Sequence, residues 1–173
     1  ALARNIPQAI LNAKGGFGKC THVIAGSAYY TFPKPEARLR ARIGNTWDVL
    51  EEDARVLMET TEKVLKEHPD LVLLWHDTHY KLLGNSILQC PPADWRSPHV
   101  VDAWNVCFRA RYAKWLKSSK YKARAGYIDT RHITGPMWDS GEDWSHLPDQ
   151  VEIPEVRHIL QAVFDFSLAV RKG

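Results

Sequence analysis

Length, composition and charge exclude several classes of protein. With 173 residues, of which 45% are hydrophobic and 25% charged, the chain has the size and composition of one globular domain and not of a disordered protein. Its net charge of +3 is too small to indicate nucleic-acid binding, and no stretch reaches the roughly 18 apolar residues that a membrane span requires.

The N-terminal half predicts a helix, a strand and a second, longer helix. Residues 3–13 place isoleucine and alanine at helical spacing and are followed by Gly15-Gly16. Residues 17–30 contain an apolar, β-branched run typical of a strand, which Pro33 ends. Residues 48–67 then carry an apolar stripe with the period of a long helix.

The C-terminal half continues the alternation of strands and helices. Residues 71–75 form a continuous apolar run, as in strands buried on both faces of a parallel sheet. A helix is expected at 101–117, a strand at 125–129 and an amphipathic helix at 151–170. This order predicts a single α/β domain over residues 1–173 with a mostly parallel, doubly wound sheet, although the strand that begins such folds is absent.

The loop before the last helix carries the strongest catalytic candidates. Asp143 and His146 are three residues apart in a stretch rich in glycine, proline and serine, so both side chains can lie on one side of a turn. A carboxylate that orients an imidazole, which in turn takes a proton from a nucleophile, is a recurrent hydrolytic arrangement. The alternative is that Asp143 caps the last helix and His146 is a solvated loop residue.

The stretch around this pair also resembles a known family. Residues 127–146 contain Tyr-Ile-Asp-Thr, Ile-Thr-Gly-Pro-Met-Trp-Asp and Asp-Trp-Ser-His, close to the ending D-x-x-x-x-T-x-P-x-W-D … D-W-x-H. That ending resembles the SGNH (GDSL-type) hydrolases, in the branch of PC-esterase, trichome-birefringence-like and sialate O-acetyltransferase-type domains. The resemblance implies a flavodoxin-like three-layer α/β/α sandwich, with Asp143 and His146 as the catalytic pair.

Two further blocks of the family pattern have counterparts. Gly44, just before the long helix, resembles the second block, whose glycine N–H helps to form an oxyanion hole. Residues 69–80 resemble the third block, of which His79 is retained. The resemblance therefore implies that Gly44 and His79 belong to the oxyanion or binding part of the site.

The first block, Gly-Asp-Ser-x-x-Arg, lacks a full counterpart. If Arg4 is its arginine, Ala1 stands where the nucleophilic serine is expected, and the preceding strand is missing. Ser27, which follows a glycine after a predicted strand, is the alternative nucleophile, but prolines and not a helix follow it. A helix N-terminus at that point would favour the developing oxyanion. A sheet without its first strand is expected to leave a slot beside residues 71–75 or to take a strand from a partner.

These features lead to two functional hypotheses. The first is a degenerate SGNH-type domain that is inactive on its own and serves as a structural or interaction subunit among other protein chains. The alternative is a serine esterase or acyl transferase that acts on ester-modified glycans or lipids. Asp143 and His146 would then form the dyad, and the nucleophile would come from a missing segment or from Ser27.

A metal site and a cofactor are not expected. His76, Asp77 and His79 could act as metal ligands, but the resemblance assigns their loop to an oxyanion pocket, and no further ligand cluster accompanies them. Asp129 and Asp139 are interpreted as turn and cap residues.

Other residues give less specific signals. Trp104 and Trp115, on the helix at 101–117, are interpreted as core residues. The three cysteines allow at most one disulfide, and no secretory signal is visible in the chain, which leaves its localisation open.

Overall fold

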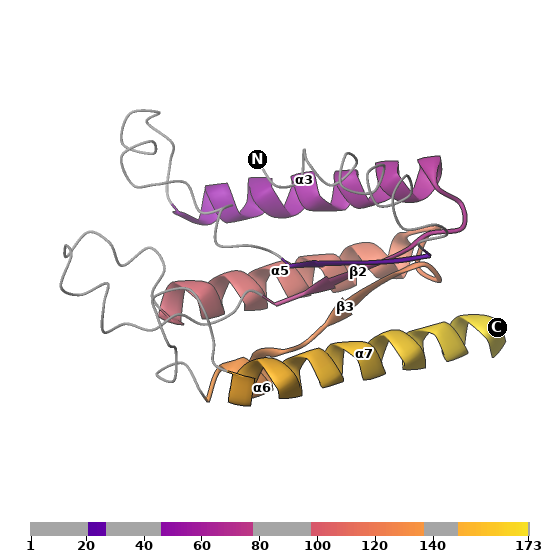
Figure 1. The fold of residues 1–173 in the computed structure, drawn as a ribbon. Coiled ribbons are helices and arrows are strands. Elements are labelled where there is room, and N and C mark those ends of the chain that lie inside the picture. The colour runs from indigo at the N-terminus through magenta and orange to yellow at the C-terminus, as the bar shows by residue number, and fades with distance from the viewer. Residues whose placement is uncertain (1–20, 27–45, 78–97, 137–148, 173) are drawn as a thin grey trace.

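The computed structural model describes residues 21–26, 46–77, 98–136 and 149–172 (Figure 1). In chain order the elements are β1 (His22–Gly26), α3 (Thr46–Glu67), β2 (Val72–His76), α5 (Pro98–Ser118), β3 (Ala125–Ile128), α6 (Arg131–Thr134) and α7 (Asp149–Lys172). Each strand and long helix predicted for these ranges is present, with its ends shifted by a few residues, which confirms an α/β fold. The short helix α6 lies in a stretch that we had expected to be a loop.

The three strands form a parallel sheet in the order β1-β2-β3. Val72 and the next three residues are buried, as predicted for a strand covered on both faces. The slot expected beside residues 71–75 does not exist, because β2 is the central strand and pairs along both of its edges. It is β1 whose outer edge has no strand partner within the described ranges.

One face of the sheet packs against α3 and α5. Leu73, Trp75 and Ala125 point to this side and belong to the larger buried cluster. On α5, the ring of Phe108 stacks between those of Trp104 and Tyr112 with centroid distances of 5.7 Å, and the ring of Trp75 meets it edge-on at 6.2 Å. The α5 aromatics therefore form the centre of the core, which confirms the interpretation of Trp104; Trp115 is half-buried at its margin.

The side chains of Trp75 and Thr61 are hydrogen-bonded inside this layer. The indole Nε1 of Trp75 donates to the Thr61 hydroxyl at 2.9 Å, and this hydroxyl donates to the Leu57 carbonyl oxygen at 2.8 Å. Both hydrogen bonds are buried, so they anchor the central strand to α3 without leaving a desolvated donor.

A single arginine closes the carboxyl end of α3. Arg124, just before β3, donates from Nη2 to the carbonyl oxygen of Leu65 at 2.8 Å, and from Nη1 to those of His68 and Leu71 at 2.9 and 3.1 Å. These contacts place a positive charge at the negative end of the helix dipole and satisfy one carbonyl of the last turn and two just beyond the helix.

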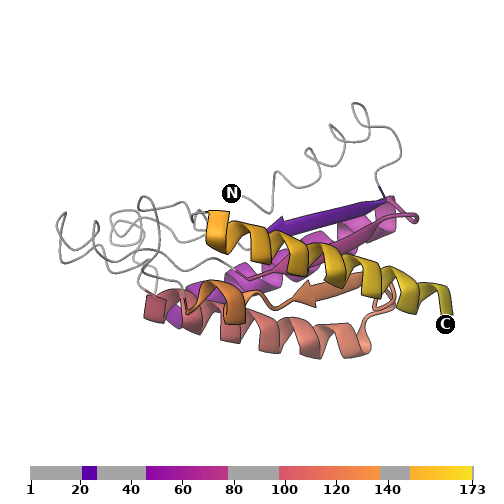
Figure 2. The same cartoon turned by 60° about the horizontal axis from the view of Figure 1, so that its bottom comes forward.

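The opposite face of the sheet is covered by α7 (Figure 2). Its smaller buried cluster contains Val72, Leu74 and Ile128, packed against half-buried residues of α7: Ile159, Ala162, Val163 and Phe166. Gly126 permits this approach, because a Cβ there would stand 2.8 Å from Leu74 Cδ2 and 3.1 Å from Phe166 Cε2. The sheet thus has helices on both faces.

Candidate functional site

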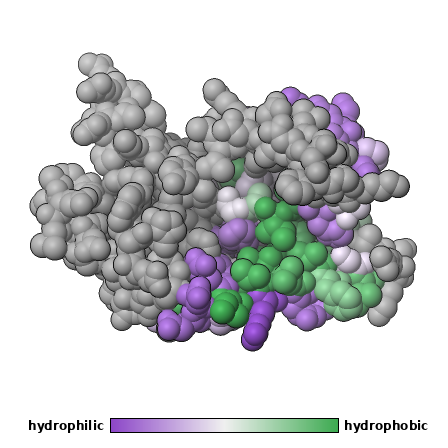
Figure 3. Space-filling view, in the orientation of Figure 1, coloured by the Kyte–Doolittle hydropathy of each residue, from purple (hydrophilic) through white to green (hydrophobic). Residues whose placement is uncertain are grey.

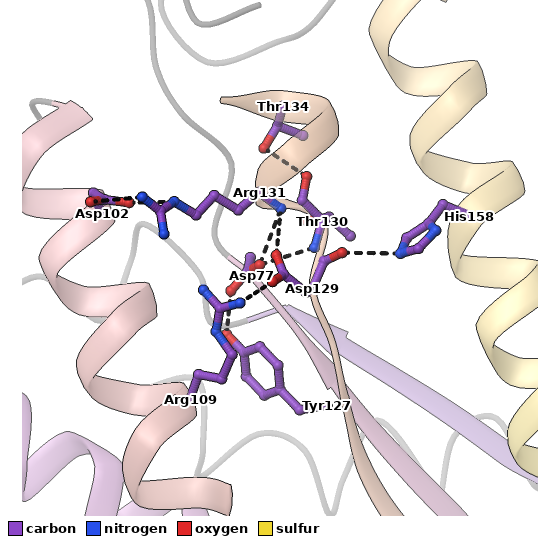
Figure 4. A network of polar contacts seen from close by, with 9 residues as sticks. All are labelled: Asp77, Asp102, Arg109, Tyr127, Asp129, Thr130, Arg131, Thr134 and His158. Carbon is purple, nitrogen blue, oxygen red and sulfur yellow. Dashed lines mark hydrogen bonds and ion pairs between the residues drawn. The ribbon is translucent and has the colours of Figure 1, made fainter. Parts of the chain in front are cut away.

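The strands bring polar residues together at one edge of the sheet. Because all three strands are parallel, their carboxyl ends meet at the same edge, where ligands of open α/β sheets usually bind. Asp77 directly follows β2, and Asp129 directly follows the neighbouring strand β3. Figure 4 shows both carboxyl groups within one network that includes side chains from α5 and α7.

Asp77 is buried and fixes the turn after β3. Its Oδ1 accepts the Tyr127 hydroxyl at 2.6 Å. Its Oδ2 accepts the backbone N–H groups of Thr130 at 2.9 Å and Arg131 at 3.2 Å. The side chain therefore ties the end of β2 to the start of α6, whose first N–H groups would otherwise lack acceptors.

Asp129 forms the charged part of the network. It makes an ion pair with Arg109 of α5, and its Oδ1 accepts the Arg131 backbone N–H at 3.1 Å. The interpretation of Asp129 as a turn residue is thus confirmed, but it omitted the ion pair. On the other side, His158 of α7 donates from Nε2 to the Asp129 carbonyl oxygen at 3.0 Å.

The two carboxyl groups have opposite tendencies to ionise. Burial raises the pKa of Asp77, and the hydrogen bond and negative charge of Asp129 act in the same direction, against the Tyr127 hydroxyl. Burial alone would also raise the pKa of Asp129, but the hydrogen bond with Asp77 and the Arg109 guanidinium outweigh it and hold that pKa below its ordinary value. Within the pair, Asp77 therefore holds a proton more readily than Asp129.

Tyr127 completes the network as a fixed donor. Burial, together with the nearby Asp77 carboxyl, raises the pKa of Tyr127 far above its ordinary value. Its hydroxyl accordingly stays protonated at any physiological pH. The network as a whole stabilises the chain path from β3 into α6 and, through an Arg131–Asp102 ion pair of 2.7 Å, the contact of α6 with α5.

A histidine reaches across the same edge from β2 to β1. His76 donates from Nδ1 to the Asp77 carbonyl oxygen at 2.8 Å, which leaves Nε2 as the acceptor nitrogen of the neutral ring. That Nε2 lies 2.8 Å from the point where a Cβ on Gly26 would stand. An imidazole thus covers the last residue of β1, and Ser27 is the next residue in the chain.

A serine and a histidine also meet at the opposite edge, but their hydrogen bonds run in the wrong direction for catalysis. Ser167 donates to the Val163 carbonyl oxygen at 2.7 Å, so it accepts from His22 Nε2 at 2.9 Å. His22 Nδ1 then accepts from the Thr21 hydroxyl at 2.9 Å. A nucleophilic serine donates to its histidine, so this chain of hydrogen bonds instead links β1 to α7.

Most of the residues predicted from the sequence lie outside the described ranges. They are Ala1, Ser27, Gly44, His79, Asp143 and His146. Of the suggested metal ligands, His76 and Asp77 are described, and the described residues contain no group of three or more histidine, cysteine, aspartate or glutamate side chains that could hold a metal ion.

Sequence reasoning missed the association of Asp77 with Asp129 and Arg109. The signal was present, because an aspartate stands at or just beyond the end of each of two predicted strands, and neighbouring parallel strands end at the same edge. Arg109 gave no such signal, since an arginine on an amphipathic helix is usually solvated.

Comparisons with protein-family models, curated proteins and solved structures found no match. No helix within the described ranges is long and apolar enough to cross a membrane. What this chain does is therefore inferred from its own motifs and geometry.

Proposed function

We propose that this chain is a degenerate SGNH-hydrolase-like domain with a flavodoxin-like three-layer α/β/α arrangement. By itself it is not a competent esterase, and it serves as a structural or interaction subunit of a larger assembly. The observation that carries this proposal is the way the polar side chains are used at the carboxyl edge of the sheet. The polar side chains gathered there pair with one another and hold the backbone, and the described part of the edge contains no serine.

The fold supports the family part of the proposal. The strands are parallel, helices cover both faces of the sheet, and the segment with Asp143 and His146 connects α6 to α7. Asp77 and Asp129 hold the start of α6, the helix that leads into this segment. An SGNH-type site would use this edge, since its catalytic loop follows the last strand.

The outer edge of β1 supports the subunit role. Among the described residues β1 is the end strand of the sheet and has β2 as its strand partner, so a strand from a partner chain would add at its outer edge. Strand addition of this kind is a recurrent mode of protein association.

Ester hydrolysis tests the proposal directly. We expect the purified 173-residue chain to hydrolyse p-nitrophenyl acetate at the same rate as its His146→Ala variant. Removing the histidine of a working triad typically lowers kcat by roughly four or more orders of magnitude. His132→Ala is the matched control, because His132 is an exposed histidine at the same edge of the sheet. A rate abolished in His146→Ala and retained in His132→Ala would contradict the proposal.

A serine esterase is the second candidate, and the position of His76 favours it. Its Nε2 lies over Gly26, immediately before Ser27, which is the alternative nucleophile of the sequence. If the chain is active on ester-modified glycans or lipids, Ser27→Ala should abolish p-nitrophenyl acetate hydrolysis together with His146→Ala. Activity that survives Ser27→Ala would assign the nucleophile to another serine.

A further inference from the structure

One side of α7 exposes a continuous line of large apolar residues. Their spacing of three or four residues places them on one side of the helix, and they are between 37% and 58% exposed. Figure 3 shows apolar surface in the lower part of the view, where Figure 1 places α7. We call this surface the α7 stripe; its residues are Ile153, Val156, Leu160, Phe164 and Leu168.

The α7 stripe faces away from the sheet. Phe166 packs against the sheet, and Phe164 stands two positions earlier, which is about 200° around the helix. On its side of the sheet, α7 is the outermost layer of the described chain (Figure 1). Large apolar side chains on the outer side of an outermost helix add nothing to the core of the same chain. A continuous line of them therefore indicates an interaction surface.

The two ends of the α7 stripe are continued by opposite charges. Asp149 stands 11 residues before Leu160, and Arg171 stands 11 residues after it, both within α7. Eleven residues are close to three helical turns, so both positions fall nearly in line with Leu160. The line therefore runs from an acidic position through apolar residues to a basic position, with Leu160 at its centre.

We propose that the α7 stripe is the contact between two copies of this chain, with the two α7 helices antiparallel about a two-fold axis at Leu160. In this arrangement Val156 of one copy lies opposite Phe164 of the other, and position 149 lies opposite position 171. The acidic end of each helix then meets the basic end of the other, which is the self-complementarity that a two-fold interface requires. This homodimer goes beyond the function proposed above, and it forms whether or not the chain is an esterase.

The molecular mass in solution tests the dimer. At roughly 100 μM, a concentration chosen because one helix pair makes a small interface, light scattering should give twice the 19.8 kDa of the chain. Leu160→Glu should give the mass of one chain with an unchanged circular dichroism spectrum, because Leu160 is 58% exposed. Gln161→Glu is the matched control. It places the same side chain on the next exposed position, about 100° away, and should remain a dimer. A parent chain of 19.8 kDa, or equal masses for the two variants, would overturn the proposal.

Disulfide trapping tests the direction and register of the two helices. With Cys20, Cys90 and Cys107 replaced by serine, Leu160→Cys lies on the two-fold axis and should link two chains on mild oxidation. Phe164→Cys should link them far less, because antiparallel pairing separates the two copies of position 164 by about 12 Å along the helices. Parallel helices would link through both variants alike. That outcome, or no link through Leu160→Cys, would contradict the proposed arrangement.

An exchange of charges tests whether the ends of the two helices meet. Asp149→Lys brings like charges together at both ends of the contact and should raise the Kd of the dimer roughly threefold or more in sedimentation equilibrium. Adding Arg171→Asp to this variant should return the Kd toward that of the parent chain. A double variant that dimerises no better than Asp149→Lys would show that the ends do not meet, and the antiparallel register would be wrong.

Discussion

The two faces of the sheet are covered by helices of different kinds. On the α3 and α5 side, aromatic rings from α5 pack against one another and meet Trp75 edge-on, and all of them except Trp115 at the margin are buried. On the other side, α7 is the only described helix, and its residues that touch the sheet are half-buried. The comparison shows that α3 and the aromatic-rich helix α5 together close one face around a buried core, whereas one helix closes the other face only in part.

Truncating one aromatic residue on each face should give unequal losses of stability. Phe108→Ala removes a fully buried ring that contacts Trp75, Trp104 and Tyr112, and we expect it to lower the free energy of unfolding by about 3–5 kcal/mol. Phe166→Ala should cost about 1–2 kcal/mol, since the ring is half-buried. Urea denaturation monitored by circular dichroism measures both values.

This contrast holds only if both variants unfold in one transition. The m-values should therefore stay equal to that of the parent chain. Equal losses for the two variants would show that the α7 face is as closed as the α5 face.

Removing the arginine that closes α3 should have an intermediate effect. In Arg124→Ala the carbonyl oxygens of Leu65, His68 and Leu71 lose the hydrogen bonds from the guanidinium, for an expected loss of about 2–3 kcal/mol. Lys122→Ala is the control, because Lys122 is exposed on the same turn and should change stability by less than about 0.5 kcal/mol. Similar urea midpoints for the two variants would show that the hydrogen bonds of Arg124 do not stabilise the packing of α3.

The smallest effect is expected for Asp77→Asn at the carboxyl edge. Both oxygens of Asp77 accept hydrogen bonds, from Tyr127 and from Thr130, and an asparagine keeps the shape of the side chain and one of these acceptors. The variant should therefore lose about 1 kcal/mol in urea denaturation, less than Asp77→Ala, which leaves all of these buried donors without an acceptor.

The pH dependence of stability tests the raised pKa of Asp77 directly. Because the pKa of Asp77 is raised in the folded chain, the native state binds more protons than the unfolded chain above the ordinary aspartate pKa of about 3.9. The contribution of Asp77 is thus complete below that pH and is lost as the pH rises through its folded-state pKa. The stability of the parent chain relative to Asp77→Asn should fall as the pH is raised from about 4. A difference that grows with pH would mean that folding lowers the pKa of Asp77 instead of raising it.

The elements were predictable from the sequence because their signals are local. The continuous apolar run 71–75 predicted a strand buried on both faces, and the apolar and aromatic residues of 101–117 predicted a helix; the structure has both. Local patterns did not predict the order of the strands. The expected slot beside 71–75 was wrong, because a sequence pattern does not state which strand lies at an edge.

The site was less predictable, for a different reason. Asp77 and Arg109 lie 32 residues apart in the sequence and meet at one edge only once α5 has packed on the sheet. The family motif predicted Asp143 and His146 from their spacing, and that prediction stays a prediction. Helix α6 was missed because its four residues are too short to show a period.

The contacts of Arg124 also have a consequence for the order of events in folding. Arg124 binds carbonyl oxygens that lie 53 to 59 positions earlier in the chain. The last turn of α3 therefore receives its cap only after α5 has formed and has brought the start of β3 back beside β2. Contacts of such long sequence separation tend to form late. We therefore expect the Arg124 cap mainly to slow unfolding and to leave the folding rate nearly unchanged.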